Sequence, residues 1–135
     1  MSIQTSRITK VHVGTPPTRK EWEVIEVHCN GFEGLPSERD VPVYSPEFTC
    51  SGHKWRLRVY PGGHSASDEG MIAVILENLS NKSITLDFGF SVKDKIGKVV
   101  KDFASKAALE FAPNGIVDIT NRISYLWGAH NFCQR

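Results

Sequence analysis

The longest alternation of apolar and polar residues in the chain runs from residue 83 to residue 93. Every second side chain in this segment is large and apolar, and the five are Ile84, Leu86, Phe88, Phe90 and Val92. A period of two places them together, so they predict a β-strand with one buried face. Residues 94–97 predict a turn and residues 99–103 the partner strand of a β-hairpin.

A second alternating segment covers residues 54–60. One of its faces is apolar and the other is basic, with Trp55, Leu57 and Val59 opposed to Lys54, Arg56 and Arg58. This pattern predicts a half-buried strand with a solvated basic face. The Pro-Gly-Gly segment at residues 61–63 ends the strand, because proline has no N–H for a ladder and glycines favour a turn.

Residues 71–76 are different, because all of them are apolar. Gly70 precedes this run, and the polar segment 78–81 follows it. A short apolar run between turn signals predicts a strand that is buried on both faces at the centre of a sheet. Residues 22–28 predict a further strand, and its mixed faces indicate partial cover on both sides.

Three segments have weaker patterns. Residues 6–13 fit a short strand, although their alternation is imperfect. Residues 104–111 have helical propensity but also fit an irregular strand, so both alternatives stay open. Residues 116–126 predict a long loop that leads into Trp127 and Gly128. The recurrence of short strands with turn signals between them predicts an all-β fold, an antiparallel β-sandwich.

The composition is that of a single domain without a general attraction to nucleic acid or membranes. The chain has 135 residues, of which 40% are hydrophobic, and a formal net charge of +1. One sizeable core fits this length, and the charge gives no pull toward phosphate backbones or anionic lipids. No apolar run approaches the roughly 20 residues that span a bilayer. Widely spaced cysteines and an N-terminus without an apolar signal core favour a cytoplasmic or nuclear location.

Residue types that perform catalysis or bind metals are present but scattered. The five histidines fall in unrelated segments, and no H-E-x-x-H motif occurs. The sequence has no G-x-S-x-G motif and no phosphate-binding glycine loop, and the polar segment 64–68 is typical of a turn. We therefore predict no catalytic residue, no metal site, no cofactor and no enzyme activity.

Several segments together resemble one domain family. They are Ser45-Pro46-Glu47-Phe48, Gly52-His53-Lys54-Trp55, Tyr60-Pro61-Gly62-Gly63, residues 22–25, 71–77 and 86–92, and Trp127-Gly128 with Phe132. In this order they are similar to the MATH domain, which also forms the C-terminal domain of TRAF signalling proteins. The resemblance covers residues 21–135 and leaves residues 1–20 as an N-terminal segment. It implies an antiparallel β-sandwich of about seven to eight strands.

The resemblance also implies a protein-interaction module. In the family, a shallow groove on one sheet holds an extended peptide of a partner protein, with backbone pairing to a strand. The residues that match groove positions are Met71, Phe88, Leu109, Trp127 and Gly128. Without the resemblance, the sequence favours a different interpretation of two of these residues. The alternation favours a core position for Phe88, and a tryptophan such as Trp127 more often fills the end of a sandwich core than binds a ligand.

The surroundings of Trp127 depart from the family. Adaptor-type members have an acidic residue before this tryptophan and an aromatic residue after the glycine, whereas this chain has Leu126 and Ala129. An apolar wall replaces a hydrogen-bond acceptor, so a more apolar ligand than a serine- and threonine-rich peptide is expected. The basic face of residues 54–60 is most simply a solvated face, and binding of acidic or phosphorylated peptides is the lesser alternative.

The resemblance suggests a cellular role without naming a ligand. Related domains often precede a BTB domain that engages a cullin-type ubiquitin ligase, so selection of substrates for a ubiquitin ligase is one expectation. Self-association without a peptide ligand is an alternative from another class. Carbohydrate binding is a second alternative, which would need coplanar exposed aromatic residues that the sequence does not show.

One last expectation concerns a sheet edge. In the family, a final strand follows the tryptophan-glycine segment and runs beside the first strand of the domain, whereas this sequence stops at Arg135. The neighbouring strand would then have an open edge, which invites pairing with another chain. Residues 6–13 can cover it by folding back beside residues 22–28, and we favour this arrangement over a homodimer through the open edge.

Overall fold

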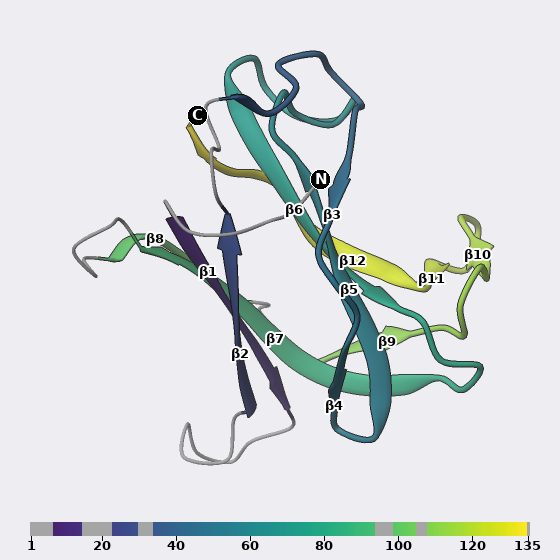
Figure 1. Ribbon diagram of the computed structural model, residues 1–135. Coiled ribbons are helices and arrows are strands. Elements are labelled where there is room, and N and C mark those ends of the chain that lie inside the picture. Colours follow the sequence, from purple (N-terminus) through teal and green to yellow (C-terminus); the bar gives the residue numbers. More distant parts are fainter. Residues whose placement is uncertain (1–6, 15–22, 30–33, 94–98, 105–107, 135) are drawn as a thin grey trace.

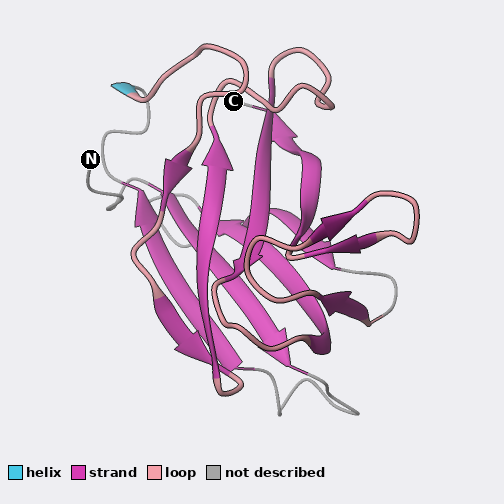
Figure 2. Ribbon diagram, turned by 90° about the vertical axis from the view of Figure 1, so that its right-hand side faces the viewer, coloured by secondary structure: helices cyan, strands magenta, loops and turns pink. Residues whose placement is uncertain are grey.

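The computed structural model describes residues 7–14, 23–29, 34–93, 99–104 and 108–134, and it shows two β-sheets packed face to face (Figure 1, Figure 2). The strands of these residues are β1 (Arg7–Gly14), β2 (Glu23–Cys29), β3 (Val43–Tyr44), β4 (Phe48–Cys50), β5 (His53–Tyr60), β6 (Met71–Asn78), β7 (Ile84–Lys93), β8 (Val99–Ala104), β9 (Leu109–Phe111), β10 (Val117–Asp118), β11 (Ile123–Ser124) and β12 (Leu126–Gln134). The predicted all-β sandwich is confirmed.

The two sheets have seven and five strands. The seven-stranded sheet has the order β10-β11-β9-β7-β1-β2, and β8 also pairs with β7. The five-stranded sheet has the order β12-β6-β5-β3, and β4 also pairs with β5. All of these pairings are antiparallel except the short contact between β11 and β9. The predicted hairpin is present as β7 and β8, while its turn at residues 94–97 lies outside the described residues.

The core lies between the sheets and consists mainly of the inward faces of β5, β6 and β7. The two alternating segments predicted these faces correctly, since Trp55, Leu57, Phe88 and Phe90 are each at most 1% exposed. Aromatic rings interlock across the sandwich, with ring centres 5.1 Å apart for Trp55 and Phe111. Because truncating a buried aromatic side chain costs about 3–5 kcal/mol, these rings are a major source of stability.

Strand β6 is buried on both faces, as the apolar run predicted. It lies between β5 and β12. Val74 and Leu76 point into the core, whereas Ala73 and Ile75 point to the outer face and are still only 0% and 6% exposed. Other side chains therefore cover this outer face, since neither of the two sheets formed by the described strands packs on it.

Strand β1 lies between β2 and β7 in the seven-stranded sheet (Figure 1). Val11 is opposite Ile25 in one antiparallel pairing and opposite Phe90 in the other. The predicted return of the N-terminal segment beside residues 22–28 is thus confirmed. The structure adds that β1 is an interior strand, because among the described strands it alone connects β2 to the rest of the sheet.

Two segments of the second half of the chain differ from expectation. The open choice for residues 104–111 resolves in favour of strand, because Ala104 ends β8 and residues 109–111 form β9. The long loop predicted for residues 116–126 is wrong, because β10 and β11 form a small hairpin there. Trp127 and Gly128 also lie within β12 and not on a loop. Two-residue strands are too short to give an alternating pattern, so the sequence could not reveal this hairpin.

Candidate binding surface

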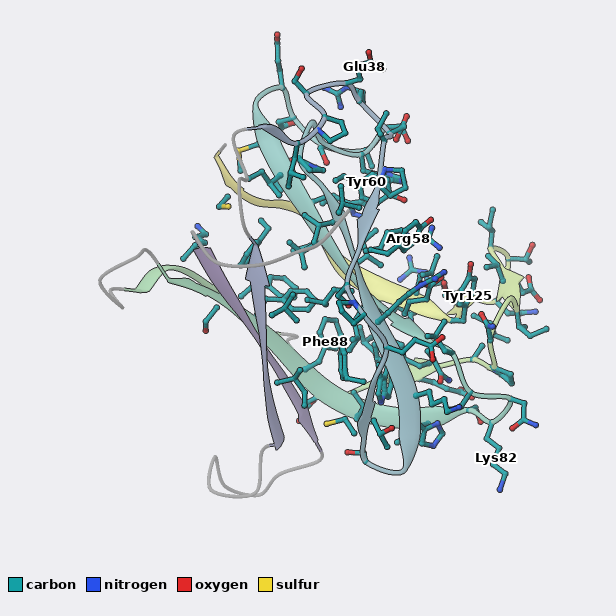
Figure 3. The ribbon with its side chains drawn as sticks, in the orientation of Figure 1. Glu38, Arg58, Tyr60, Lys82, Phe88 and Tyr125 are labelled. Atoms are coloured by element: carbon teal, nitrogen blue, oxygen red, sulfur yellow. The ribbon has the colours of Figure 1, made fainter. Side chains whose placement is uncertain are left out.

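Phe88, a predicted groove residue, lies in the core between the two sheets (Figure 3). It is 1% exposed, and its ring contacts those of Phe90, Phe103 and Phe111 at centre distances of 5.5, 6.0 and 5.4 Å. A side chain that is fully enclosed by other rings offers no surface to a peptide. The assignment of Phe88 to a groove is therefore corrected to the core position that the alternation favoured.

Trp127 connects the two sheets. It lies opposite Leu76 in the five-stranded sheet, and its partly buried ring packs against the core. Its Nε1–H donates a 2.7 Å hydrogen bond to the carbonyl oxygen of Glu110 in β9, which belongs to the seven-stranded sheet. These contacts are those of a side chain that fills the end of the core, and a role of Trp127 in binding a peptide stays a prediction.

Glycine is required at position 128 because β12 approaches β6 closely there. A Cβ atom at this position would lie 2.2 Å from the carbonyl oxygen of Val74 and 2.6 Å from the Cα atom of Ile75. These are backbone atoms of a paired strand, so they cannot move aside without disturbing the ladder. The structure explains Gly128 by packing, and its contact with a ligand stays a prediction.

Met71 and Leu109 lie away from each other in the fold. Met71 begins β6, whereas Trp127 pairs near the other end of that strand, opposite Leu76. The five residue-to-residue steps from Met71 to Leu76 span about 17 Å in an extended strand. Leu109 lies in β9 of the seven-stranded sheet and packs against the core. The structure therefore does not bring the predicted groove residues together on one surface.

The outer face of the five-stranded sheet, which points away from the core, carries a different group of side chains. We call this group the outer-face cluster, and its members are Tyr44, Arg56, Arg58, Tyr60, Glu77 and Tyr125. The strand register brings them together, since Arg56 is opposite Glu77 and Tyr44 is opposite Arg58. Figure 3 shows Arg58 and Tyr125 on the side of the sheet that faces away from Phe88.

Glu77 is the centre of the outer-face cluster. Its side chain is only 2% exposed, and its Oε1 atom accepts a 2.6 Å hydrogen bond from Nη2 of Arg58. Its Oε2 atom accepts a hydrogen bond from Nε of Arg56. The guanidinium carbon of Arg56 also lies 4.2 Å from the ring centre of Tyr44, which is a cation–π contact. The buried carboxylate thus holds both arginines in defined positions.

Both arginines stay charged in this environment. Burial alone lowers the pKa of Arg58, but the hydrogen bond to Tyr60, the charge of Glu77 and a hydrogen bond to Tyr125 outweigh it, so the pKa is raised. The hydrogen bond to Glu77 raises the pKa of Arg56 against a smaller opposing effect of burial. Two positive charges therefore face one buried negative charge, and the cluster keeps a net positive charge.

The prediction of a simple solvated basic face is wrong for Arg56 and Arg58. Their side chains are 32% and 17% exposed, because they fold over the sheet onto Glu77. On the same outer side, Tyr60 and Leu126 pack with Ala73 and Ile75. The sequence did contain a signal for this arrangement, since a strand buried on both faces needs a cover on its outer face as well.

Strand β12 borders this outer face and ends the five-stranded sheet. The N–H of Asn78 donates to the carbonyl oxygen of Tyr125, which sets the hydrogen-bonding phase of the β6–β12 ladder. Because hydrogen-bonded positions alternate in an antiparallel pair, the backbone groups of Leu126 and Gly128 point away from β6. The Leu126 N–H bonds to the Ser124 side chain, so Gly128 presents the next outward donor and acceptor.

A histidine pair lies at the middle of β12. The ring centres of His64 and His130 are 4.9 Å apart. Burial is the larger cause that lowers the pKa of His130, and the electrostatic effect of the nearby His64 lowers it further.

Nowhere in the described part of the chain do three or more His, Cys, Asp or Glu residues gather closely enough to hold a metal ion. Nor do the described residues include a helix that is long and apolar enough to cross a membrane.

The sequence profile of the MATH domain matches residues 26–135. The match starts within β2 and extends through β12, so it includes every strand of the five-stranded sheet. Strand β1 precedes it. No curated protein matches the chain.

Proposed function

Because the chain belongs to the MATH domain family, whose domains are protein-interaction modules, we propose that it binds an extended segment of a partner protein across the outer face of the five-stranded sheet. The observation that carries this proposal is the outer-face cluster. Tyrosine and arginine are, with tryptophan, the residue types most enriched among those that dominate binding energy at protein interfaces. Here they gather on one face of the sheet, around a buried carboxylate.

The cluster is already ordered before a partner binds. Glu77 fixes both arginines through hydrogen bonds, and Tyr44, which is 40% exposed, stacks on Arg56. Side chains that are held in place lose little conformational entropy on binding, which favours affinity. Arg56 is the more exposed of the two arginines, so it is the one that we expect to meet a carbonyl or carboxylate of the ligand.

The end position of β12 supplies a second element of recognition. A ligand that pairs with an edge strand gains backbone hydrogen bonds, while its alternate side chains reach the face of the sheet. The outward backbone groups of Gly128 are suited to this pairing. A short linear peptide placed along β12 would put one row of side chains over Leu126 and the outer-face cluster.

The test is a binding measurement with peptides from an array of random sequences. We expect Tyr44→Ala and Arg56→Ala each to weaken binding by about tenfold or more, with little change in melting temperature, because both side chains are partly exposed. Lys101→Ala is the matched control, since Lys101 is an exposed cation on β8 of the other sheet. Unchanged binding in both cluster variants would exclude this face as the site.

For the finer role we propose selection of substrates for a ubiquitin ligase inside the cell, without catalysis by this domain. Support comes from the resemblance to MATH domains that precede BTB domains. Co-purification of a cullin with the complete protein from its own cells would test this role. A full-length protein that binds its peptide ligand but never a cullin would contradict it.

A further inference from the structure

Exposed apolar side chains are concentrated on the β10–β11 hairpin. Among the described residues, the large hydrophobic side chains that are exposed are Tyr44 and four on this hairpin, namely Ile116, Val117, Ile119 and Ile123, at 50%, 53%, 88% and 36% exposure. A soluble surface normally scatters such residues singly, and a group of them marks an interaction site. Tyr44 belongs to the outer-face cluster, so the exposed apolar surface lies in these two places.

The hairpin presents these side chains from an ordered turn. Asp118 accepts hydrogen bonds at its Oδ1 atom from the N–H groups of Thr120 and Asn121, at 3.1 and 3.3 Å, and at its Oδ2 atom from the Asn121 amide at 2.8 Å. Arg122 follows with a φ of 55°, which closes the turn. The tip that carries Ile119 is therefore shaped by local hydrogen bonds before any partner is present.

The base of the hairpin is joined to the outer-face cluster. The N–H of Tyr125 donates to the carbonyl oxygen of Ile116 at 3.1 Å, and the side chain of Tyr125 is close enough to Arg58 to help raise the pKa of that arginine. The next residue, Leu126, packs on the apolar group that includes Tyr60. Figure 1 shows the hairpin on the side of the five-stranded sheet opposite the seven-stranded β1–β2 region, which is also the side of Arg58 and Tyr125 in Figure 3.

The chemistry of the hairpin selects the kind of ligand. Residues 113–124 contain one acid and one base, Asp118 and Arg122, and neither lysine nor an aromatic residue. A membrane-binding surface would carry basic and aromatic residues, and a nucleic-acid surface would carry clustered positive charge. Branched aliphatic side chains without net charge instead match apolar side chains of a protein segment, because both surfaces leave water on contact.

We propose that the hairpin forms an apolar extension of the binding surface and that the ligand is an extended protein segment with aliphatic side chains at the end that meets the hairpin. This inference rests on the proposed function, since it assigns a ligand class to the same surface. In an extended segment, alternate side chains point the same way. The aliphatic residues of the ligand should therefore recur at every second position, while its other end carries the acceptors for Arg56.

The experiment screens an array of random synthetic peptides of about ten residues, which span roughly 33 Å when extended. It compares the wild-type chain with the variant Ile116→Ser/Val117→Ser/Ile119→Ser. We expect the wild type to select peptides with Val, Ile or Leu at alternate positions of one end. The variant should lose that selection and bind the selected peptides about tenfold or more weakly. The single variant Ile119→Ser, at the most exposed position, should shift the selection in the same direction and serves if the triple variant does not fold.

Tyr44→Ser is the matched control, because it weakens the cluster and should keep the aliphatic selection among the peptides that still bind. A wild-type chain that selects peptides without aliphatic enrichment would overturn the inference and leave the proposed function standing. Hairpin variants that retain the wild-type selection would also overturn the inference and leave the proposed function standing. A folded wild-type chain that binds no peptide on the array would overturn the proposed function, and this inference with it.

Discussion

The two sheets bury their inner faces against each other in the same manner, but their outer faces differ. On the seven-stranded sheet, the outward pair Thr85 and Glu110 is exposed to solvent. On the five-stranded sheet, Ala73, Ile75 and Glu77 also point outward and are at most 6% exposed. Tyr60 and Leu126 pack with the first two, and two arginines pair with Glu77. An outer face that is closed by charged and aromatic side chains adds little stability for the charges that it buries. It does hold those side chains in fixed positions, which is what specific binding requires.

We expect the largest effect from removing residues 1–13, which affects the seven-stranded sheet alone. The deletion takes away nearly all of β1, so β2 loses its described strand partner and β7 exposes one edge. Exposed edges pair with other chains, and the truncated protein should form dimers or aggregates. Analytical ultracentrifugation measures this outcome. A monomer with unchanged stability would mean that β1 is dispensable and that the edge is protected in another way.

The next largest effect should come from Glu77→Ala in the five-stranded sheet. The substitution leaves the mostly buried Arg58 and its neighbour Arg56 without their shared carboxylate, which should cost about 3 kcal/mol of unfolding free energy. Glu77→Gln keeps the shape and one acceptor, so its loss should be smaller. Urea denaturation gives both values, with the exposed Glu110→Ala as the control on the other sheet. Equal, small losses in all three variants would show that the carboxylate does not organise the cluster.

An intermediate effect is expected for Trp127, whose side chain joins the two sheets. Trp127→Ala removes partly buried packing and the hydrogen bond to Glu110, and should lower stability by about 2 kcal/mol. Trp127→Phe keeps most of the packing and should lose only about 1 kcal/mol. Melting temperature and peptide affinity should be measured together. An alanine variant that melts like the wild type but binds about thirtyfold more weakly would restore Trp127 as a binding anchor.

The smallest effect concerns pH and the histidine pair at the middle of β12. Burial and the neighbouring His64 lower the pKa of His130 in the folded protein, so the unfolded chain takes up its proton first as the pH falls. The contribution of neutral His130 to the stability of the fold is fully present above about pH 6.5, which is the pKa of histidine in the unfolded chain. It is lost as the pH falls through the lowered pKa of the folded protein. The melting temperature should therefore drop more between pH 7.5 and 5.5 in the wild type than in His130→Asn. Parallel curves for the two proteins would show that this pair does not contribute.

The residues that form each face of the long strands could be predicted from the sequence. The period of two in residues 54–60 and 83–93 identified Trp55, Leu57, Phe88 and Phe90 as inward residues, and all of them are buried. The family resemblance agreed with the fold, and the profile match confirms the family. Transfer of single groove positions was less reliable, as Phe88 shows, because the alignment of a motif does not state which way a side chain points in this packing.

The outer-face cluster was not found from the sequence, although every member was visible in it. Arg56 and Glu77 are 21 residues apart and Arg58 and Glu77 are 19 apart, so no local pattern joins them. Their contact depends on the register between β5 and β6. The basic positions were interpreted as solvated because a strand alone does not show what lies beside it.

The alternation of side chains along a strand is a local property of the backbone, so the sequence could determine which residues share a face, and it correctly indicated a β-sandwich with residues 71–76 at its centre. The choice of neighbouring strands is a long-range property that depends on chain connectivity and on the competition among many pairings. Only the tertiary structure therefore decided that β1 enters between β2 and β7, that Glu77 joins two arginines, and that β12 carries Trp127 between the two sheets.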